Sequence, residues 1–298
     1  MEEHLRYKKE KVMKVGLTVC SNGQDPERKK QIGDLIRVFE TMGVEAVPSD
    51  HIYRKTDVFS APDRARAEDL MRFYRDDYID AIYDISGGDL ANGVLPYLDY
   101  DLIGSSGKAF WGYSDLTCVI NAVYAKTGKV SVLYQVRNLV WEDAELQSKR
   151  FAAYLSGDKM PLFGFRYRFL QGDHMKGTLL GGNIRCFLKL AGTRYWPDLK
   201  GKILLLESLG GESGQIATLL SQLDQTGAFE QISGILLGTF TAYEKAGLTL
   251  SVFDLLKTHI PEDLPVAVTA EIGHGTDARA VYIGRKYELY GCRDTAVF

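Results

Sequence analysis

The chain has 298 residues, of which 45% are hydrophobic and 25% are charged, and this composition excludes a wholly disordered protein. With 36 basic and 39 acidic side chains, the formal net charge is -3, so no basic excess points to nucleic acid or to a membrane surface as a partner. The four cysteines lie far apart, which argues against a disulfide framework and a zinc ribbon.

Strands and helices are predicted to alternate over roughly the first 135 residues. The alternation predicts right-handed βαβ crossovers and a parallel sheet. The expected strands are 15–19, 44–47, 79–85 and 108–112, and the expected helices are 28–42, 61–78 and 116–126.

Hydrophobic periodicity weakens between residues 141 and 173, so this segment is interpreted as the connection between two domains at 1–140 and 174–298. The second domain is also predicted to be α/β, with a mixed or irregular sheet. Its expected strands are 177–181, 202–207, 233–239, 264–270, 280–283 and 287–290, and its expected helices are 184–190, 215–223 and 249–259.

The spacing of glycines and histidines disfavours a nucleotide or metal site. No Gly-x-Gly-x-x-Gly follows the first expected strand, and the P-loop-like segment 104–108 is followed by Ala109 where a magnesium-binding hydroxyl would stand. The five histidines form no ligand pair. We therefore expect neither a cofactor nor a metal.

The charged start of the chain and the lack of a run of about 18 apolar residues predict a cytoplasmic protein without a membrane segment.

Ser114 lies between an apolar strand and an amphipathic helix, which is the context of a nucleophile elbow. Gly112 precedes it by two positions, but Leu116 occupies the place where a second glycine would stand. The local pattern leaves two interpretations open: Ser114 is a nucleophile, or Ser114 or Asp115 caps the helix that follows.

Three further segments offer the other parts of a hydrolase site. Gly87 and Gly88 end the third expected strand, where a flexible backbone can supply an oxyanion donor. Glu207 ends a strongly apolar strand, where an ionised group needs a partner unless it turns to solvent or caps the next element. His274 follows an apolar strand between two glycines, at the kind of loop where α/β proteins place their sites.

These segments together resemble the LD-carboxypeptidase family of serine peptidases, which includes the microcin C self-immunity proteins. The likeness follows the family's order of landmarks over nearly the whole chain. It is carried by 87–88 with 95–99, 112–117, 180–183, 206–207 and 273–275.

The resemblance implies a Ser114-Glu207-His274 triad, formed between an N-terminal parallel-sheet, Rossmann-like domain and a C-terminal β-rich α/β domain in a homodimer, with no metal or cofactor. Family members cut an amide bond next to a free carboxylate, typically releasing D-alanine from murein tetrapeptide during cytoplasmic wall recycling. The immunity branch cleaves peptidyl or aminoacyl nucleotides. The chain departs from the family pattern at Ser86, where many members carry arginine, and at Ser208, where an acidic residue is frequent.

In the expected mechanism, His274 takes the proton of Ser114, Glu207 orients the imidazole, and the backbone N–H groups of Gly88 and Asp115 bind the oxyanion. The side chain of Asp115 is expected to fix the elbow.

The expected partner is a small peptide or a peptidyl nucleotide. Arg185 and Gly87 are the candidate contacts to it, because a pocket that positions the bond between an L- and a D-amino acid must bind the terminal carboxylate of the substrate. In the immunity-like alternative, Trp141 or Trp196 could stack on adenine. A second alternative is a non-catalytic two-domain binder of a small molecule.

Overall fold

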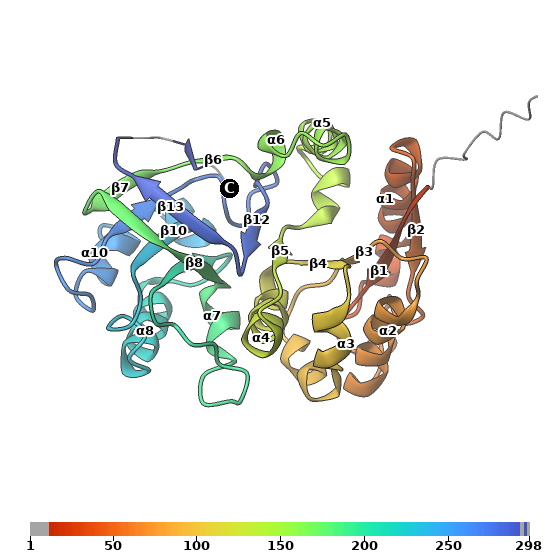
Figure 1. The fold of residues 1–298 in the computed structure, drawn as a ribbon, viewed down its shortest axis with the longest axis horizontal. Coiled ribbons are helices and arrows are strands. Elements are labelled where there is room, and N and C mark those ends of the chain that lie inside the picture. The colour runs from red at the N-terminus through yellow and green to blue at the C-terminus, as the bar shows by residue number, and fades with distance from the viewer. Residues whose placement is uncertain (1–11, 293–294, 297–298) are drawn as a thin grey trace, which may run out of the picture.

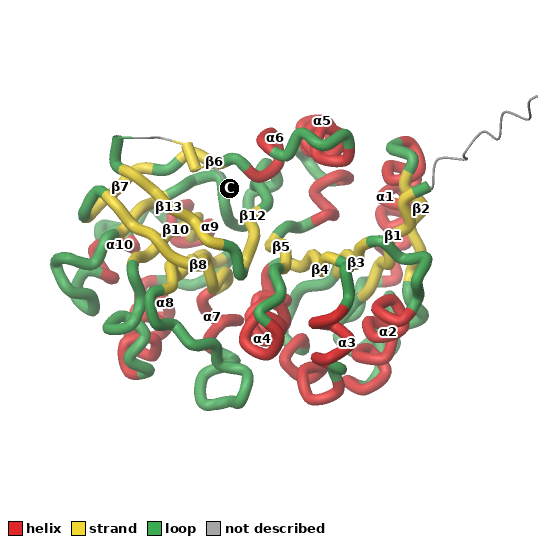
Figure 2. The backbone as a smooth tube through the Cα atoms, in the orientation of Figure 1, coloured by secondary structure: helices red, strands yellow, loops and turns green. Residues whose placement is uncertain are grey.

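The computed structural model describes residues 12–292 and 295–296. The chain forms two six-stranded sheets that lie side by side with helices around them, and a third sheet of two short strands (Figures 1 and 2). The predicted two-domain α/β fold is therefore confirmed. Within the described ranges, every helix is too short or too polar to span a lipid bilayer.

The first sheet has the strand order β12-β5-β4-β3-β1-β2. Strands β1 to β5 are all parallel, and β12 pairs antiparallel with β5 at the edge. The parallel part has the doubly wound order 2-1-3-4-5, which reverses direction between β1 and β3. Its strands are β1 (Met13–Thr18), β2 (Val44–Pro48), β3 (Ala81–Asp84), β4 (Ala109–Gly112), β5 (Ser131–Leu133) and β12 (Val281–Ile283).

Helices cover both faces of this sheet, and the longer helices bury apolar side chains against it. In α1, for example, the buried residues are Ile32, Leu35 and Phe39, which share one helical face. The helical segments are η1 (Pro26–Arg28), α1 (Lys29–Thr41), α2 (Asp63–Arg75), η2 (Ala91–Tyr97), α3 (Tyr100–Ser105), η3 (Ser114–Leu116), α4 (Thr117–Thr127), η4 (Val136–Val140), α5 (Ala144–Leu155) and α6 (Met160–Phe163).

The second sheet has the order β13-β8-β9-β10-β11-β7, with β8 to β11 parallel and the two outer strands antiparallel to their neighbours. A separate pair joins β6 to β14. These elements are β6 (Phe165–Arg166), β7 (Arg168–Gln171), β8 (His174–Asn183), α7 (Ile184–Leu188), β9 (Lys202–Ser208), α8 (Ser213–Gln225), β10 (Gly234–Phe240), α9 (Thr241–Lys245), α10 (Val252–Leu256), β11 (Val266–Val268), β13 (Lys286–Tyr290) and β14 (Thr295–Ala296).

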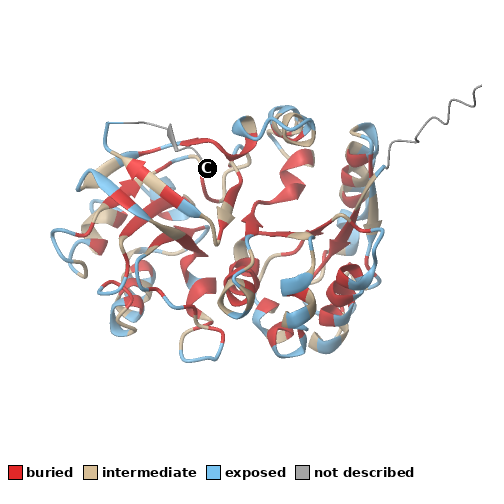
Figure 3. Cartoon of the chain, in the orientation of Figure 1, coloured by how far each residue is buried: buried red, intermediate tan, exposed pale blue. Residues whose placement is uncertain are grey.

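Helix α4 joins the two halves. The side chain of Asn121 donates a hydrogen bond to the carbonyl of Gly181 on β8 (2.9 Å) and accepts one from its N–H (2.8 Å). Gly182 allows close contact here, because a Cβ atom on it would lie 2.8 Å from Thr117 Oγ1. One continuous apolar core runs through α4 into both halves, as the buried segments in Figure 3 show. Helix α4 thus packs against both halves of the chain.

Several regions differ from the sequence-based expectations. Strand β12, which was expected in the second domain, pairs with β5 in the first sheet. The supposed connection 141–173 contains α5, α6, β6 and β7, and β7 is an edge strand of the second sheet. The periodicity of α5 is weak because only Gln147 and Phe151 are buried. Strand β5 was not predicted, and the helix expected at 249–259 is limited to Val252–Leu256.

Candidate active site

The candidate site lies at the carboxyl ends of the first sheet's strands, where the strand order reverses. The segments after β1 and β3 leave the sheet in opposite directions, and such a switch point is where doubly wound proteins bind ligands. Asn22, after β1, donates its backbone N–H to the carbonyl of Gly87, after β3, over 3.2 Å. Ser114 follows the next strand, β4.

Ser114 has a strained backbone conformation, with φ of +54°. Gly112 makes the sharp turn possible, because a Cβ atom there would lie 2.7 Å from the Cβ of Leu116. Neither η3 nor α4 has a side-chain cap, so the interpretation of Ser114 or Asp115 as a helix cap is wrong. The backbone has the form of a nucleophile elbow.

The structure brings the three predicted side chains into one hydrogen-bonded line. His274 Nε2 lies 3.1 Å from Ser114 Oγ, and His274 Nδ1 lies 2.6 Å from Glu207 Oε2. Glu207 is fully buried, so the alternative that it turns to solvent is wrong. A serine, an imidazole and a carboxylate in this order can activate the serine hydroxyl for attack.

His274 is positioned by a loop that packs tightly against β10. Gly273 has φ of +145°, and a Cβ atom there would lie 1.9 Å from Thr239 Oγ1, so only glycine fits. The ring of Tyr113 packs against the imidazole at 4.6 Å between centroids. His274 is six residues beyond the end of β11 at Val268, and not directly after the strand as expected.

Glu207 occupies the carboxyl end of β9. Gly238 on the neighbouring β10 leaves room for it, because a Cβ atom on Gly238 would lie 3.0 Å from the Cβ of Glu207. The second carboxylate oxygen, Oε1, has no hydrogen-bond partner within the described residues. Burial, reinforced by the charge of Glu207, raises the pKa of Tyr113 well above its ordinary value, so the phenol stays neutral.

Gly87 and Gly88 lie opposite Ser114, and Asn22 fixes their peptide groups. The side-chain oxygen of Asn22 accepts the N–H of Asp89 (3.0 Å), while its backbone holds the carbonyl of Gly87. The N–H of Gly88 makes no hydrogen bond inside the described part of the chain. Gly88 lines the same two cavities as Ser114.

We predict that Gly88→Ala reduces kcat far more than Gly87→Ala does. Gly88 has φ of +122°, and a Cβ atom on it would lie 2.2 Å from Asn22 Cγ, so the loop must move. At Gly87 the added atom meets Ser114 Cβ at an ordinary 3.9 Å. Loss of one oxyanion donor costs about 100-fold in kcat. Steady-state kinetics on both variants check this, and equal losses would contradict the role of the Gly88 backbone.

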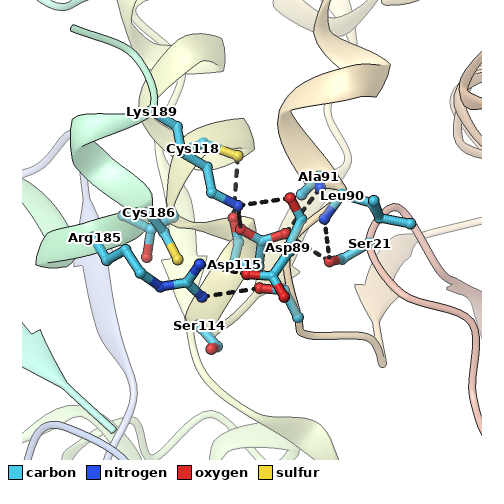
Figure 4. Close-up of polar contacts among 12 residues, drawn as sticks. Ser21, Asp89, Leu90, Ala91, Ser114, Asp115, Cys118, Arg185, Cys186 and Lys189 are labelled. Carbon is cyan, nitrogen blue, oxygen red and sulfur yellow. Dashed lines mark hydrogen bonds and ion pairs between the residues drawn. The ribbon is translucent and has the colours of Figure 1, made fainter. Parts of the chain in front are cut away.

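Asp115 is held by contacts from three separate segments, which Figure 4 shows converging on it. Its Oδ2 accepts hydrogen bonds from Ser21 Oγ (2.6 Å) and from the backbone N–H of Ala91 (2.8 Å). Its Oδ1 forms an ion pair with Lys189, which follows α7. Lys189 Nζ also donates to the carbonyl of Asp89 (2.8 Å). The pair therefore ties the serine elbow and the glycine loop to the second half of the chain.

We predict that Lys189→Met destabilises the protein by about 3 kcal/mol, because the fully buried carboxylate of Asp115 loses its counter-ion. The double variant Lys189→Met with Asp115→Asn should recover part of this loss, since the buried charge is then gone. Chemical denaturation of both variants measures the two free energies of unfolding. A single variant as stable as the wild type would show that the ion pair contributes little.

Ser86 supports the same loops through its hydroxyl group. Ser86 Oγ donates to Asp84 Oδ1 (2.5 Å) and accepts the backbone N–H of Ser21 (2.9 Å). Asp84 also accepts the N–H of Cys20 (2.7 Å), and burial raises the pKa of this carboxyl group. Ser86 therefore joins the ends of β1 and β3.

Two cavities open on Ser114 and Gly88. The larger, of about 960 Å³, extends over the second half of the chain between Arg185 and the start of α8. The smaller, of about 360 Å³, lies over the first half and includes His274 and Arg137 in its lining. A substrate bound across Ser114 can thus place one part in each cavity.

The other candidate residues from the sequence are Arg185, Trp141 and Trp196, and only the first two line a cavity at Ser114. Arg185 lines the larger cavity, where it donates to the carbonyl of Gly88 (3.1 Å) and pairs with Asp89. Trp141 lines the smaller cavity, whereas Trp196 packs on Phe187 with 4.8 Å between ring centroids. In the described residues, no three His, Cys, Asp or Glu side chains converge to hold a metal ion.

Three residues at the site, Asn22, Lys189 and Arg137, were not predicted from the sequence. Asn22 had a detectable signal, because it follows the first strand at the carboxyl edge where a parallel sheet places its site. Lys189 and Arg137 had none, since each reaches the site only through the packing of distant segments.

Comparison with known proteins identifies the family. The family profile described as the LD-carboxypeptidase N-terminal domain matches residues 15–135, and the profile of the C-terminal domain matches residues 176–289. The chain belongs to the LD-carboxypeptidase family. The resemblance stated from the sequence and the assignment to the serine-type carboxypeptidases are therefore confirmed.

Similar proteins match this LD-carboxypeptidase family member over nearly its full length. A protein of Bacillus subtilis named "Probable murein peptide carboxypeptidase" is 27% identical over 98% of this chain and 94% of its own. The structure of MccF in complex with glutamyl sulfamoyl guanosine has a TM-score of 0.86 at 18% identity, covering 96% of each chain. The muramoyltetrapeptide carboxypeptidase of Oxalobacter formigenes has a TM-score of 0.80 at 21% identity, covering 95% of this chain and 97% of its own.

Proposed function

We propose that the protein is a serine LD-carboxypeptidase that hydrolyses the amide bond before a C-terminal D-amino acid, with Ser114, Glu207 and His274 as its catalytic residues. The observation that carries the proposal is the line from Glu207 Oε2 through the imidazole to Ser114 Oγ, with contacts of 2.6 Å and 3.1 Å. The alternative of a non-catalytic binder gives no reason for a strained serine in contact with a buried His–Glu pair.

The first step forms an acyl-enzyme. Neutral His274 accepts the Ser114 proton at Nε2 while Oγ attacks the carbonyl carbon, and Glu207 stabilises the imidazolium. The oxyanion receives hydrogen bonds from the backbone N–H groups of Gly88 and Asp115. When the C–N bond breaks, Nε2–H passes its proton to the leaving amine.

The second step reverses these roles with water. His274 takes a proton from a water molecule, the hydroxide attacks the ester carbonyl, and the oxyanion occupies the same donors. Collapse of the intermediate returns the proton to Ser114 Oγ and releases the shortened peptide as a free acid. Each step uses groups that are already in hydrogen-bonded positions.

The proposed substrate is murein tetrapeptide, from which the enzyme releases D-alanine. Family membership and relatives named murein peptide and murein tetrapeptide carboxypeptidases support this substrate. The alternative is an aminoacyl nucleotide, because an MccF structure with a similar fold holds glutamyl sulfamoyl guanosine.

The test is incubation with murein tetrapeptide and, separately, with an aminoacyl sulfamoyl adenosine, followed by mass spectrometry. We expect the tetrapeptide to lose its terminal D-alanine and the sulfamoyl nucleotide to remain intact. Cleavage of the nucleotide alone would assign the protein to the immunity-like branch, and cleavage of neither would contradict both assignments.

Four expectations from the sequence stay predictions. They are the division into domains at 1–140 and 174–298, the homodimer, the cytoplasmic location and the part in peptidoglycan recycling.

A further inference from the structure

Arg137, in η4, is a buried cation in the smaller cavity. The residue is 8% exposed, and it donates from Nη1 to Gln24 Oε1 (3.1 Å) and from Nε to Gln135 Oε1 (3.3 Å). Both partners are neutral amides. Within the described residues, no aspartate or glutamate forms an ion pair with Arg137. Its guanidinium therefore has no ion-pair partner in this part of the chain, although the charge of the buried Asp84 raises its pKa.

The surroundings of Arg137 keep it charged and oriented. Burial, followed by the nearby charge of Arg28, lowers the pKa of Arg137 to about 10, which still leaves it protonated at neutral pH. Its guanidinium carbon lies 4.8 Å from the ring centre of Trp141, a cation–π contact. Arg28 and Arg54 also line the cavity, and the charge of Arg54 is matched by Asp25. The lining of the cavity thus carries three arginines and one aspartate, Asp25, and has an excess of positive charge.

The position of His274 shows which part of a substrate enters this cavity. His274 lines the smaller cavity and not the larger one, whereas Ser114 and Gly88 line both. In the proposed mechanism, the imidazole must hand its proton to the leaving amine, so the leaving group lies on the side of His274. The larger cavity then accommodates the acyl part of the peptide.

We propose that Arg137 binds the free carboxylate of the C-terminal amino acid that leaves, and so selects substrates whose scissile bond is one residue from a free C-terminus. This inference rests on the proposed function. A guanidinium matches a carboxylate in shape and charge, and its planar group donates two parallel hydrogen bonds. The modest volume of about 360 Å³ suits a single amino acid. Arg185 lines the other cavity and is already paired with Asp89.

The test compares murein tetrapeptide with its C-terminal amide on the wild type and on Arg137→Gln. We expect the wild type to prefer the free acid by about 10- to 100-fold in kcat/KM. Arg137→Gln should lose this preference, mainly through a higher KM for the acid, so that it cleaves the acid and the amide with similar kcat/KM. Arg137→Lys keeps the positive charge but lacks the planar guanidinium group. Its preference for the acid should lie between that of the wild type and that of Arg137→Gln. The control is Arg37→Gln, which removes an exposed arginine paired with Asp34 and should leave the preference unchanged.

The ratio between acid and amide separates recognition from damage to the fold, because a structural defect slows both substrates equally. The inference would be overturned if Arg137→Gln kept the wild-type ratio of kcat/KM between acid and amide. If Arg137→Gln does not fold, the same criterion applies to Arg137→Lys.

Failure of the proposed function has a different signature, since the wild type would then cleave neither peptide. In that case, protection of Ser114 from a fluorophosphonate is measured. Better protection of the wild type by D-alanine than by D-alaninamide, lost in Arg137→Gln, would support the carboxylate site, and equal protection would overturn it.

Discussion

Ser114→Ala is expected to lower kcat by at least about 10⁴-fold while the protein remains folded. The substitution removes the attacking Oγ and its 3.1 Å contact with His274, and no other group in the hydrogen-bonded line can replace it. Alanine meets the same backbone strain at φ of +54° as serine does, so the elbow keeps its form. Kinetics on murein tetrapeptide measure the loss, and circular dichroism with thermal unfolding measures the fold.

Two results would contradict this expectation. Retention of more than about 1% of the wild-type rate by Ser114→Ala would show that another group attacks the carbonyl. A large drop in melting temperature would show that Ser114 has a structural role that its contacts do not reveal.

Glu207→Gln is expected to lower kcat by about 10³- to 10⁴-fold. The amide has nearly the size of the carboxylate, but it carries no charge to stabilise the imidazolium. It can also donate its NH₂ group to Nδ1, which selects the wrong tautomer of His274. The effect is large because Glu207 is fully buried, so water does not screen its 2.6 Å contact with the imidazole.

A matched control for this substitution exists on the surface. Glu288 Oε1 lies 3.2 Å from His174 Nε2, so Glu288→Gln changes another Glu–His pair, at an exposed position far from Ser114 in the sequence. We expect this variant to keep the wild-type kcat. A loss below about tenfold for Glu207→Gln would reduce Glu207 to a structural residue.

The sequence was sufficient to predict most of the fold because its apolar runs have clear periods. Helix α1 and strand β9 are visible from the spacing of their apolar residues, and both lie within a few residues of the predicted bounds. Helix α5 was missed because it rests on the core through only two buried residues, Gln147 and Phe151. No single-sequence pattern indicates that β12 joins the first sheet, since this depends on the packing of the finished fold.

The candidate site, too, was predicted from the sequence only in part. Ser114, Glu207 and His274 were found because each was predicted at or just beyond the end of a strand, where α/β proteins place their sites. Their mutual contacts join two halves of the chain, and periodicity carries no information on such contacts. Lys189 and Arg137 reach the site through long-range packing, so only the structure reveals the ion pair of Lys189 with Asp115 and the buried guanidinium of Arg137 in the smaller cavity.

Labelling with a fluorophosphonate, followed by intact-mass measurement and peptide mapping, identifies the residue that attacks. If Ser114 is a nucleophile activated by His274, one adduct per chain forms on Ser114, is absent from Ser114→Ala and forms far more slowly in His274→Ala. An unlabelled wild-type protein, or an adduct on another residue, would show that Ser114 is not the nucleophile.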